Sequence, residues 1–336
     1  MDSFTGKLAV LTGGGSGMGR ELVRQLAVQG CSVAACDIDA DSAADAAALA
    51  RAVADERVLV TSHACDVADE EQVLRFRDEL VKAHHTDHVD LVFCNAGIGG
   101  AGSFVCDKRA EWERTFAIDF WGTYYCARAF LPLLIASGDG ILVNTSSVNG
   151  FWATLGPSMP NTAYSTAKFA IKGFTEALIE DLRTNAPQVT VALVLPGHVG
   201  TDILKNSRRI LGYPGPAQMG DAELEEARPV LVRLGLPVED ATIDELREAV
   251  VKLENQFKDS APLSAAAAAT IILDGVRAGQ WRILVGEDAI LVDRAVRAQP
   301  EAAYDYDALA AAAREAQATG APAPDAPPAP DAPPAP

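Results

Sequence analysis

The chain has 336 residues, of which 49% are hydrophobic and 22% are charged, and it carries a net charge of -18 at pH 7. This length fits one large domain or two small ones. The excess of acidic groups repels phosphate backbones and anionic lipids, so we expect neither nucleic acid nor membrane as a partner.

Cysteine usage and the N-terminus predict a cytoplasmic protein. No basic region followed by a long apolar stretch opens the sequence, so we expect no signal peptide. No apolar run is long enough to cross a bilayer. The six cysteines form no C-x-x-C pair and are interpreted as small buried hydrophobic residues rather than as disulfides or metal ligands. We therefore expect no metal.

Short apolar runs alternate with helix-length amphipathic segments, such as residues 19–29 and 70–84, over the first 200 residues. The predicted strands are residues 8–12, 32–37, 58–63, 91–95, 140–146 and 189–195, and a last strand at 281–285 follows a helical run at 265–278. Several runs are almost continuously hydrophobic, as in strands buried on both faces of a parallel sheet. The alternation predicts an α/β, Rossmann-like, doubly wound parallel sheet of about seven strands.

Two regions depart from this alternation. Residues 204–262 contain helical patterns near 221–234 and 242–258 but no convincing strand. They are too long for a plain connection and predict an inserted helical lid. Residues 319–336 are rich in proline and alanine and predict an extended, disordered tail. Residues 1–318 are thus expected to form a single domain.

A glycine-rich turn joins the first strand to the first helix. It reads Thr12-Gly13-Gly14-Gly15-Ser16-Gly17-Met18-Gly19. Glycines allow a tight turn and bring backbone N–H groups close to a pyrophosphate, and the helix N-terminus attracts the negative charge. Gly13, Ser16, Gly17, Met18 and Gly19 are therefore predicted to bind a dinucleotide, although a merely tight turn would use the same residues.

Asp37 ends the second predicted strand, where a carboxylate can accept hydrogen bonds from both ribose hydroxyls. It would repel a 2′-phosphate, and the residue before Gly17 is Ser16, which cannot offset that repulsion. Arg20 lies inside the helix start and is expected to face solvent or a carboxylate. These features favour NAD over NADP. Asp37 could alternatively cap the following helix.

Tyr164 and Lys168 are four residues apart, so on a helix they share one face. An ammonium group beside a phenol favours the phenolate and lowers its pKa, and such a phenol can exchange a proton with a substrate oxygen. Ser147 follows an apolar strand and can hydrogen-bond the same oxygen. The alternative is a tyrosine and a lysine on a solvated helix face.

The motifs together resemble those of the short-chain dehydrogenases/reductases. They are Thr12-Gly13-x-x-x-Gly17-x-Gly19, Asn95-Ala96-Gly97, Ser147, Tyr164-x-x-x-Lys168 and Pro196-Gly197, in the family's order. The resemblance covers about residues 5–203 and the last strand. It implies that Tyr164 is the acid/base, that Ser147 polarises the substrate, and that Lys168 both tunes Tyr164 and binds ribose.

The resemblance also implies further cofactor contacts. Asp66 and Val67 would contact adenine, and Asn95, Ala96 and Gly97 would lie near the adenine ribose. Pro196 and Gly197 end the sixth strand, and Val199 and Thr201 would reach the nicotinamide carboxamide; a plain turn would also explain the Pro-Gly pair. Family habit further suggests a homodimer or homotetramer.

Three departures from the family pattern stand out. Asp119 occupies the place of an asparagine that completes the family's catalytic tetrad, so its charge is expected to pair with Lys168. The loop from Ser147 to Tyr164 is longer than usual; its Phe151, Trp152, Leu155 and Met159 either line the substrate site or pack locally. The 204–262 insertion is also large, and its Leu204, Ile210, Leu211, Tyr213 and Met219 suggest an apolar, bulky ligand or simply helix packing.

The sequence thus predicts an NAD-dependent enzyme that reversibly oxidises a secondary alcohol to a ketone. A 3-oxoacyl thioester reductase is the alternative within enzymes. A non-catalytic dinucleotide-binding regulator is the alternative from another class, although the serine, tyrosine and lysine are all present.

Overall fold

The computed structural model describes residues 1–100, 102–157, 159–233, 235–308 and 310–311. The predicted proline-rich tail at 319–336 lies outside the described residues. Among those residues, no helix is both long and apolar enough to cross a membrane. Five cysteines are buried as predicted, whereas Cys106 is exposed.

A parallel sheet forms the centre of the molecule and confirms the predicted fold class. Its strands are β1 (Leu8–Thr12), β2 (Ser32–Asp37), β3 (Val60–Ala64), β4 (Leu91–Cys94), β5 (Gly140–Thr145), β6 (Val189–Pro196) and β9 (Arg282–Val285). The order across the sheet is β3-β2-β1-β4-β5-β6-β9. Because the order reverses between β1 and β4, the loops after these strands diverge and leave a crevice at their carboxyl ends.

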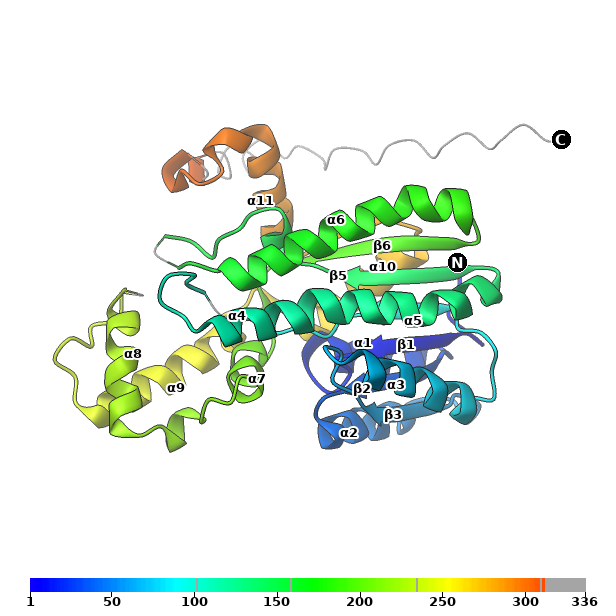
Figure 1. The fold of residues 1–336 in the computed structure, drawn as a ribbon, viewed down its shortest axis with the longest axis horizontal. Coiled ribbons are helices and arrows are strands. Elements are labelled where there is room, and N and C mark those ends of the chain that lie inside the picture. The colour runs from blue at the N-terminus through cyan, green and yellow to red at the C-terminus, as the bar shows by residue number, and fades with distance from the viewer. Residues whose placement is uncertain (101, 158, 234, 309, 312–336) are drawn as a thin grey trace.

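Helices cover both faces of the sheet (Figure 1). The helices of the main body are α1 (Gly17–Val28), α2 (Ala40–Arg51), α3 (Glu70–Ala83), α4 (Arg109–Phe116), α5 (Gly122–Ser137), α6 (Thr162–Asn185), α10 (Ala265–Arg277) and α11 (Glu287–Ala298). Side chains of α1, α2 and α10 share one buried cluster with the sheet. Side chains of α3, α5 and α6 share the other. The apolar runs of the strands therefore face packed helices on both sides, as expected for buried parallel strands.

The predicted insertion is helical. It contains α7 (Ile203–Ile210), α8 (Asp221–Arg233) and α9 (Ile243–Asp259), and it is bracketed by a two-strand parallel pair, β7 (Val199–Gly200) and β8 (Leu263–Ser264). Helices α8 and α9 project beyond the edge of the main body (Figure 1). They share a small buried cluster of their own that includes Met219, Leu224 and Leu246. Met219 therefore packs inside the insertion, in agreement with the helix-packing alternative for this residue.

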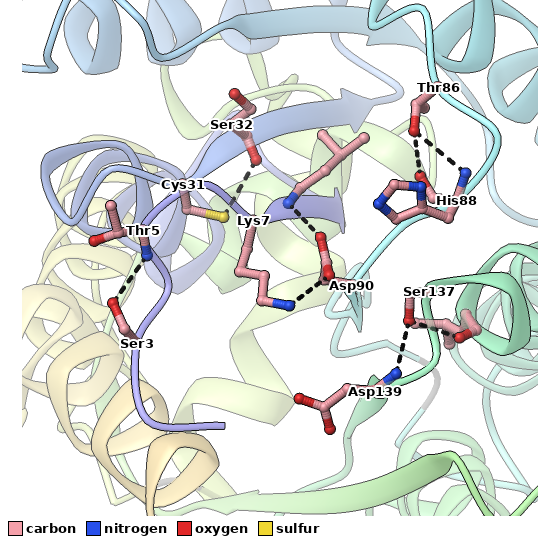
Figure 2. A network of polar contacts seen from close by, with 12 residues as sticks. Ser3, Thr5, Lys7, Cys31, Ser32, Thr86, His88, Asp90, Ser137 and Asp139 are labelled. Atoms are coloured by element: carbon pink, nitrogen blue, oxygen red, sulfur yellow. Dashed lines mark hydrogen bonds and ion pairs between the residues drawn. The ribbon is translucent and has the colours of Figure 1, made fainter.

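The amino ends of the strands are held by a buried carboxylate. Asp90, just before β4, accepts hydrogen bonds from Lys7 Nζ at 2.9 Å and from the backbone N–H of Leu8 at 2.8 Å (Figure 2). These contacts join the entrances of β1 and β4, at the edge of the sheet away from the crevice.

Asp90→Ala should lower the free energy of unfolding by about 1–3 kcal/mol, because the buried Leu8 N–H would lose its acceptor. The exposed Asp139 on the same edge (Figure 2) supplies the control. Asp139→Ala should change the stability by no more than about 0.5 kcal/mol. Urea unfolding of both variants measures the difference, and equal stabilities would contradict the assigned role of Asp90.

Candidate active site

A cleft opens at the carboxyl ends of β1, β2 and β4. Many of the predicted cofactor residues line it: Gly13, Ser16, Gly17, Met18, Gly19, Asp37, Asp66, Val67, Asn95, Ala96, Gly97 and Thr201. Ten further residues line the cleft, and of these the sequence indicated only Ile210, as a possible ligand contact: Ile38, Ser42, Cys65, Ile98, Ile118, Asp202, Ile203, Asn206, Arg209 and Ile210. Half of these ten residues belong to the start of the insertion. No local sequence pattern indicates that this segment lies over the cleft.

The glycine turn leaves no room for side chains. Gly13 has a φ of +67°, and a Cβ placed on it would lie 2.8 Å from the Cα of Ala96. A Cβ on Gly19 would lie only 1.9 Å from the carbonyl oxygen of Gly13. Helix α1 begins at Gly17, so its free N–H groups open next to the cleft. This bare turn at a helix N-terminus fits the pyrophosphate of a dinucleotide.

Hydrogen bonds fix the turn against the end of β4. Thr12 Oγ1 accepts from the backbone N–H groups of Asn95 and Ala96 at 3.0 and 3.1 Å. Asn95 Nδ2 in turn donates to the carbonyl oxygens of Thr12 at 3.2 Å and Gly13 at 3.4 Å. The two strand ends that border the crevice are thus joined directly. A Cβ on Gly97 would lie 3.1 Å from both Asp119 Oδ1 and Lys168 Nζ, which explains the small residue at this position.

Asp37 lies at the end of β2 and lines the cleft. Its carboxylate accepts hydrogen bonds from the N–H groups of Gly15 and Asp39, both at 3.0 Å. Burial raises the pKa of Asp37, and these two N–H groups partly offset the rise. The alternative interpretation of Asp37 as a helix cap is wrong, because Asp39 caps α2 by accepting from Ser42 N.

Helix α7 lies across the cleft. Arg209 forms an ion pair with Asp39, and Asn206 Nδ2 donates to Ser16 Oγ at 3.1 Å. Ser207 Oγ accepts from Gly99 N at 2.9 Å. The insertion is therefore tied to the glycine turn, to α2 and to the loop after β4 at the same time. Arg20 is exposed, as expected.

Asp66 lines the cleft and also pairs with Arg114 at 2.6 Å. The predicted cofactor residues at the end of β6 have other surroundings. Gly197 follows β6 and lies against Asp288, whose carboxylate accepts from His198 N at 2.6 Å. Pro196, Gly197 and Val199 are not among the lining residues of the cleft. Val199 lies in β7 with its side chain in the main core.

The structure brings together Ser147, Tyr164 and Lys168. Ser147 follows β5 in an extended conformation, and its Oγ accepts from Asn149 N at 3.1 Å. Tyr164 and Lys168 lie in the first turns of α6, with Lys168 Nζ 5.2 Å from the centre of the tyrosine ring. Lys168 is 3% exposed, and its Nζ donates to the carbonyl oxygen of Thr145 at 3.2 Å. Lys168 therefore does not lie on a solvated helix face, which was the alternative interpretation of the Tyr164–Lys168 spacing.

Asp119 lies in a π-helical turn, η1 (Ala117–Trp121), between α4 and α5. π-Turns inside helices are often found at functional sites. Asp119 is fully buried; its Oδ2 lies 3.5 Å from Lys168 Nζ, and its Oδ1 accepts from Ile98 N at 2.8 Å. Burial raises the pKa of Asp119, while Lys168 and the Ile98 N–H lower it. The expected pairing of Asp119 with Lys168 is present.

The pKa of Tyr164 lies above the ordinary tyrosine value in the protein alone. Burial is the main cause, and the Asp119 carboxylate raises this pKa further. Lys168 and hydrogen bonding with the Ser147 side chain lower it. Lys168 thus acts in the predicted direction, although burial outweighs its effect on the pKa of Tyr164 in the protein alone.

Comparisons with known proteins agree with this arrangement. A family model described as short chain dehydrogenase matches residues 7–211. The oxidoreductase SadH of Mycobacterium tuberculosis is 36% identical over 293 residues, which cover 87% of this chain and 91% of SadH. A 3-oxoacyl acyl-carrier-protein reductase of Synechocystis is 28% identical over 227 residues, covering 66% of this chain and 87% of that protein.

Among solved structures, a short chain dehydrogenase/reductase from Burkholderia phymatum in complex with NAD is similar. It has a TM-score of 0.65 and 26% sequence identity, and the match covers 97% of this chain and 99% of that chain. The resemblance read from the motifs is confirmed: the chain belongs to the short-chain dehydrogenase/reductase family of oxidoreductases.

Proposed function

We propose that the protein oxidises a secondary alcohol to a ketone, reversibly, with NAD. The observation that carries this proposal is the buried lysine beside Tyr164, with the Ser147 side chain within hydrogen-bonding reach of the phenol and with Gly97, which lines the cleft, next to the lysine. A proton acceptor and a hydrogen-bond donor then face the same substrate oxygen, which is what the loss of a hydroxyl proton requires.

In the proposed reaction the substrate carbinol donates its hydroxyl proton to the Tyr164 phenolate while its carbon loses a hydride. Ser147 holds the substrate oxygen by a hydrogen bond. Lys168 counters the burial of the phenol and favours the phenolate. A bound nicotinamide dinucleotide would supply the hydride acceptor and, in its oxidised form, an additional positive charge. The glycine turn and Asp37 would hold its pyrophosphate and ribose.

Reduction of a 3-oxoacyl thioester is the second candidate, favoured by the similarity to the Synechocystis reductase. The net charge of -18 disfavours a strongly acidic carrier protein as the substrate donor. The expected homodimer or homotetramer and the cytoplasmic location remain predictions from the sequence.

A substrate panel tests the proposal. Cyclic, steroid, aryl and linear secondary alcohols would be offered with NAD or NADP, and NADH or NADPH absorbance would be recorded. The matching ketones and acetoacetyl-CoA would be offered with the reduced cofactors. Turnover of an alcohol supports the proposal, and turnover of the thioester alone supports the second candidate. Tight dinucleotide binding without any turnover would favour a regulator instead.

Asp119→Asn should move the rising limb of the pH profile for alcohol oxidation to lower pH. The Asp119 carboxylate raises the pKa of Tyr164, so a neutral amide should let the phenol lose its proton at lower pH. Plots of kcat/KM against pH measure the shift. Glu113→Gln, at an exposed residue on α4 that pairs with Arg109, is the control and should leave the profile in place. If the rising limb of Asp119→Asn lies at the same pH as in the parent, or at higher pH, this electrostatic role of Asp119 is refuted.

A further inference from the structure

The end of the described chain reaches back to the loop between Ser147 and Tyr164. After α11 and a short turn at Pro300–Ala302, three successive contacts are made. Trp152 Nε1 donates to the carbonyl oxygen of Ala303 at 2.7 Å, and Ala153 N donates to Tyr304 Oη at 3.2 Å. Thr154 Oγ1 and Tyr306 Oη lie 3.1 Å apart. Each residue of 152–154 is therefore hydrogen-bonded to the C-terminal segment.

The same loop residues are connected inward to Ser147 through Asn149. Asn149 is 3% exposed, and its Nδ2 donates to the carbonyl oxygens of Trp152 at 2.9 Å and Thr154 at 2.7 Å. Its backbone N–H donates to Ser147 Oγ at 3.1 Å. A continuous path of hydrogen bonds therefore runs from residues 303–306 through the loop to Ser147.

An ion pair attaches helix α11, which precedes the C-terminal segment, to the sheet. Asp293 of α11 is 3% exposed and accepts hydrogen bonds from Arg282 Nη1 on β9 at 3.1 Å and from Arg297 Nε at 2.9 Å. The Arg282 guanidinium also lies 5.8 Å from the ring centre of Phe151. Helix α11 is thus fixed to the edge of the sheet, so the residues after it can hold the loop in place.

We infer that residues 303–306 form a positioning clamp, in which Tyr306, Tyr304 and the Ala303 carbonyl hold residues 152–154 and, through Asn149, orient Ser147. A long loop loses much conformational entropy when it is ordered, and external hydrogen bonds restrict it before substrate arrives. Misplacing a group that orients the substrate lowers the rate even when the chemistry is intact. The effect of the clamp on turnover rests on the proposed function; its effect on the loop does not.

The test compares two truncations and two point variants. A chain ending at Gln299 loses the clamp, and a chain ending at Ala311 keeps it. Tyr306→Phe removes only the hydroxyl that meets Thr154, and Tyr125→Phe on α5 is the matched control. Amide hydrogen exchange would be followed in peptides covering residues 148–161 and residues 8–20, and NADH affinity by fluorescence. KM and kcat would be measured with the panel alcohol that the parent oxidises best.

If the clamp exists, amide hydrogen exchange in residues 148–161 should be faster in the chain ending at Gln299 and in Tyr306→Phe than in the parent. Amide exchange in residues 8–20 and the affinity for NADH should stay unchanged. Loss of one hydrogen bond should lower kcat/KM about 2- to 10-fold. If Tyr306 acts through Thr154, then the double variant Thr154→Val/Tyr306→Phe should lose less kcat/KM than the product of the two single-variant losses. The chain ending at Ala311 and Tyr125→Phe should match the parent.

Unchanged exchange in 148–161 for both clamp variants would overturn the inference, and so would an equal increase in 8–20, which would mark a general loss of stability. If the parent oxidises no panel alcohol, the proposed function fails, whereas the exchange measurement still decides whether the clamp exists.

Discussion

Tyr164→Phe should lower kcat for alcohol oxidation by about 10²–10⁴-fold, the usual contribution of a general acid or base. The substitution keeps the ring that packs beside Lys168 Nζ and removes only the group that carries the proton. Dinucleotide affinity should therefore stay near the parent value. Steady-state rates and NADH fluorescence titrations measure the two quantities separately.

The pH profile gives this prediction a second readout. The parent rate should rise with pH because the phenolate is the active form, and Tyr164→Phe should lack that limb. Ser147→Ala should slow turnover with little effect on NADH affinity. Lys168→Ala should lower both the turnover rate and the affinity for NADH, because the proposed roles of this lysine include ribose binding. Near-parent turnover by Tyr164→Phe on any alcohol would refute the mechanism.

NAD should be preferred to NADP by at least about tenfold in kcat/KM, which corresponds to roughly 1.4 kcal/mol. Asp37 lines the cleft, and the N–H groups of Gly15 and Asp39 hold its carboxylate in place. A 2′-phosphate beside this carboxylate would be repelled. Arg209 also lines the cleft, but it is paired with Asp39.

Asp37→Ala should narrow the preference by improving kcat/KM with NADP relative to NAD. The exposed Asp41, in the first turn of α2, provides a charge-matched control, and Asp41→Ala should keep the parent ratio. Parallel kinetics with both cofactors measure the ratio. Equal kcat/KM values with NAD and NADP in the parent would show that Asp37 does not select the cofactor.

The fold and much of the cleft could be predicted because the relevant signals are local. Buried parallel strands need nearly continuous apolar runs, and the ends of such runs mark the edge where a cofactor binds. The glycine turn after β1 is equally local, because positions such as Gly13 tolerate no side chain.

What could not be predicted depends on contacts between distant segments. The ion pair of Arg209 with Asp39 joins residues 170 positions apart, and the clamp on Trp152 spans 151 positions; ordinary residue types make both contacts. Asp37 and Asp39 are both acidic residues before α2, and only the folded backbone shows that Asp39 is the one that caps the helix. The pKa of Tyr164 could not be read from the Tyr-x-x-x-Lys spacing, because burial depends on the whole fold.

The self-contained packing of α8 and α9 has a consequence for how new specificities could arise. Their apolar side chains are buried mainly against one another, and the chain leaves and re-enters the body at the neighbouring pair β7 and β8. Segments with such closely spaced ends tolerate replacement well. The part of the insertion that follows α7 can therefore be exchanged by natural variation or engineered grafting. Helix α7, which contacts the glycine turn, would be kept, together with the sheet and the Ser147–Tyr164–Lys168 group.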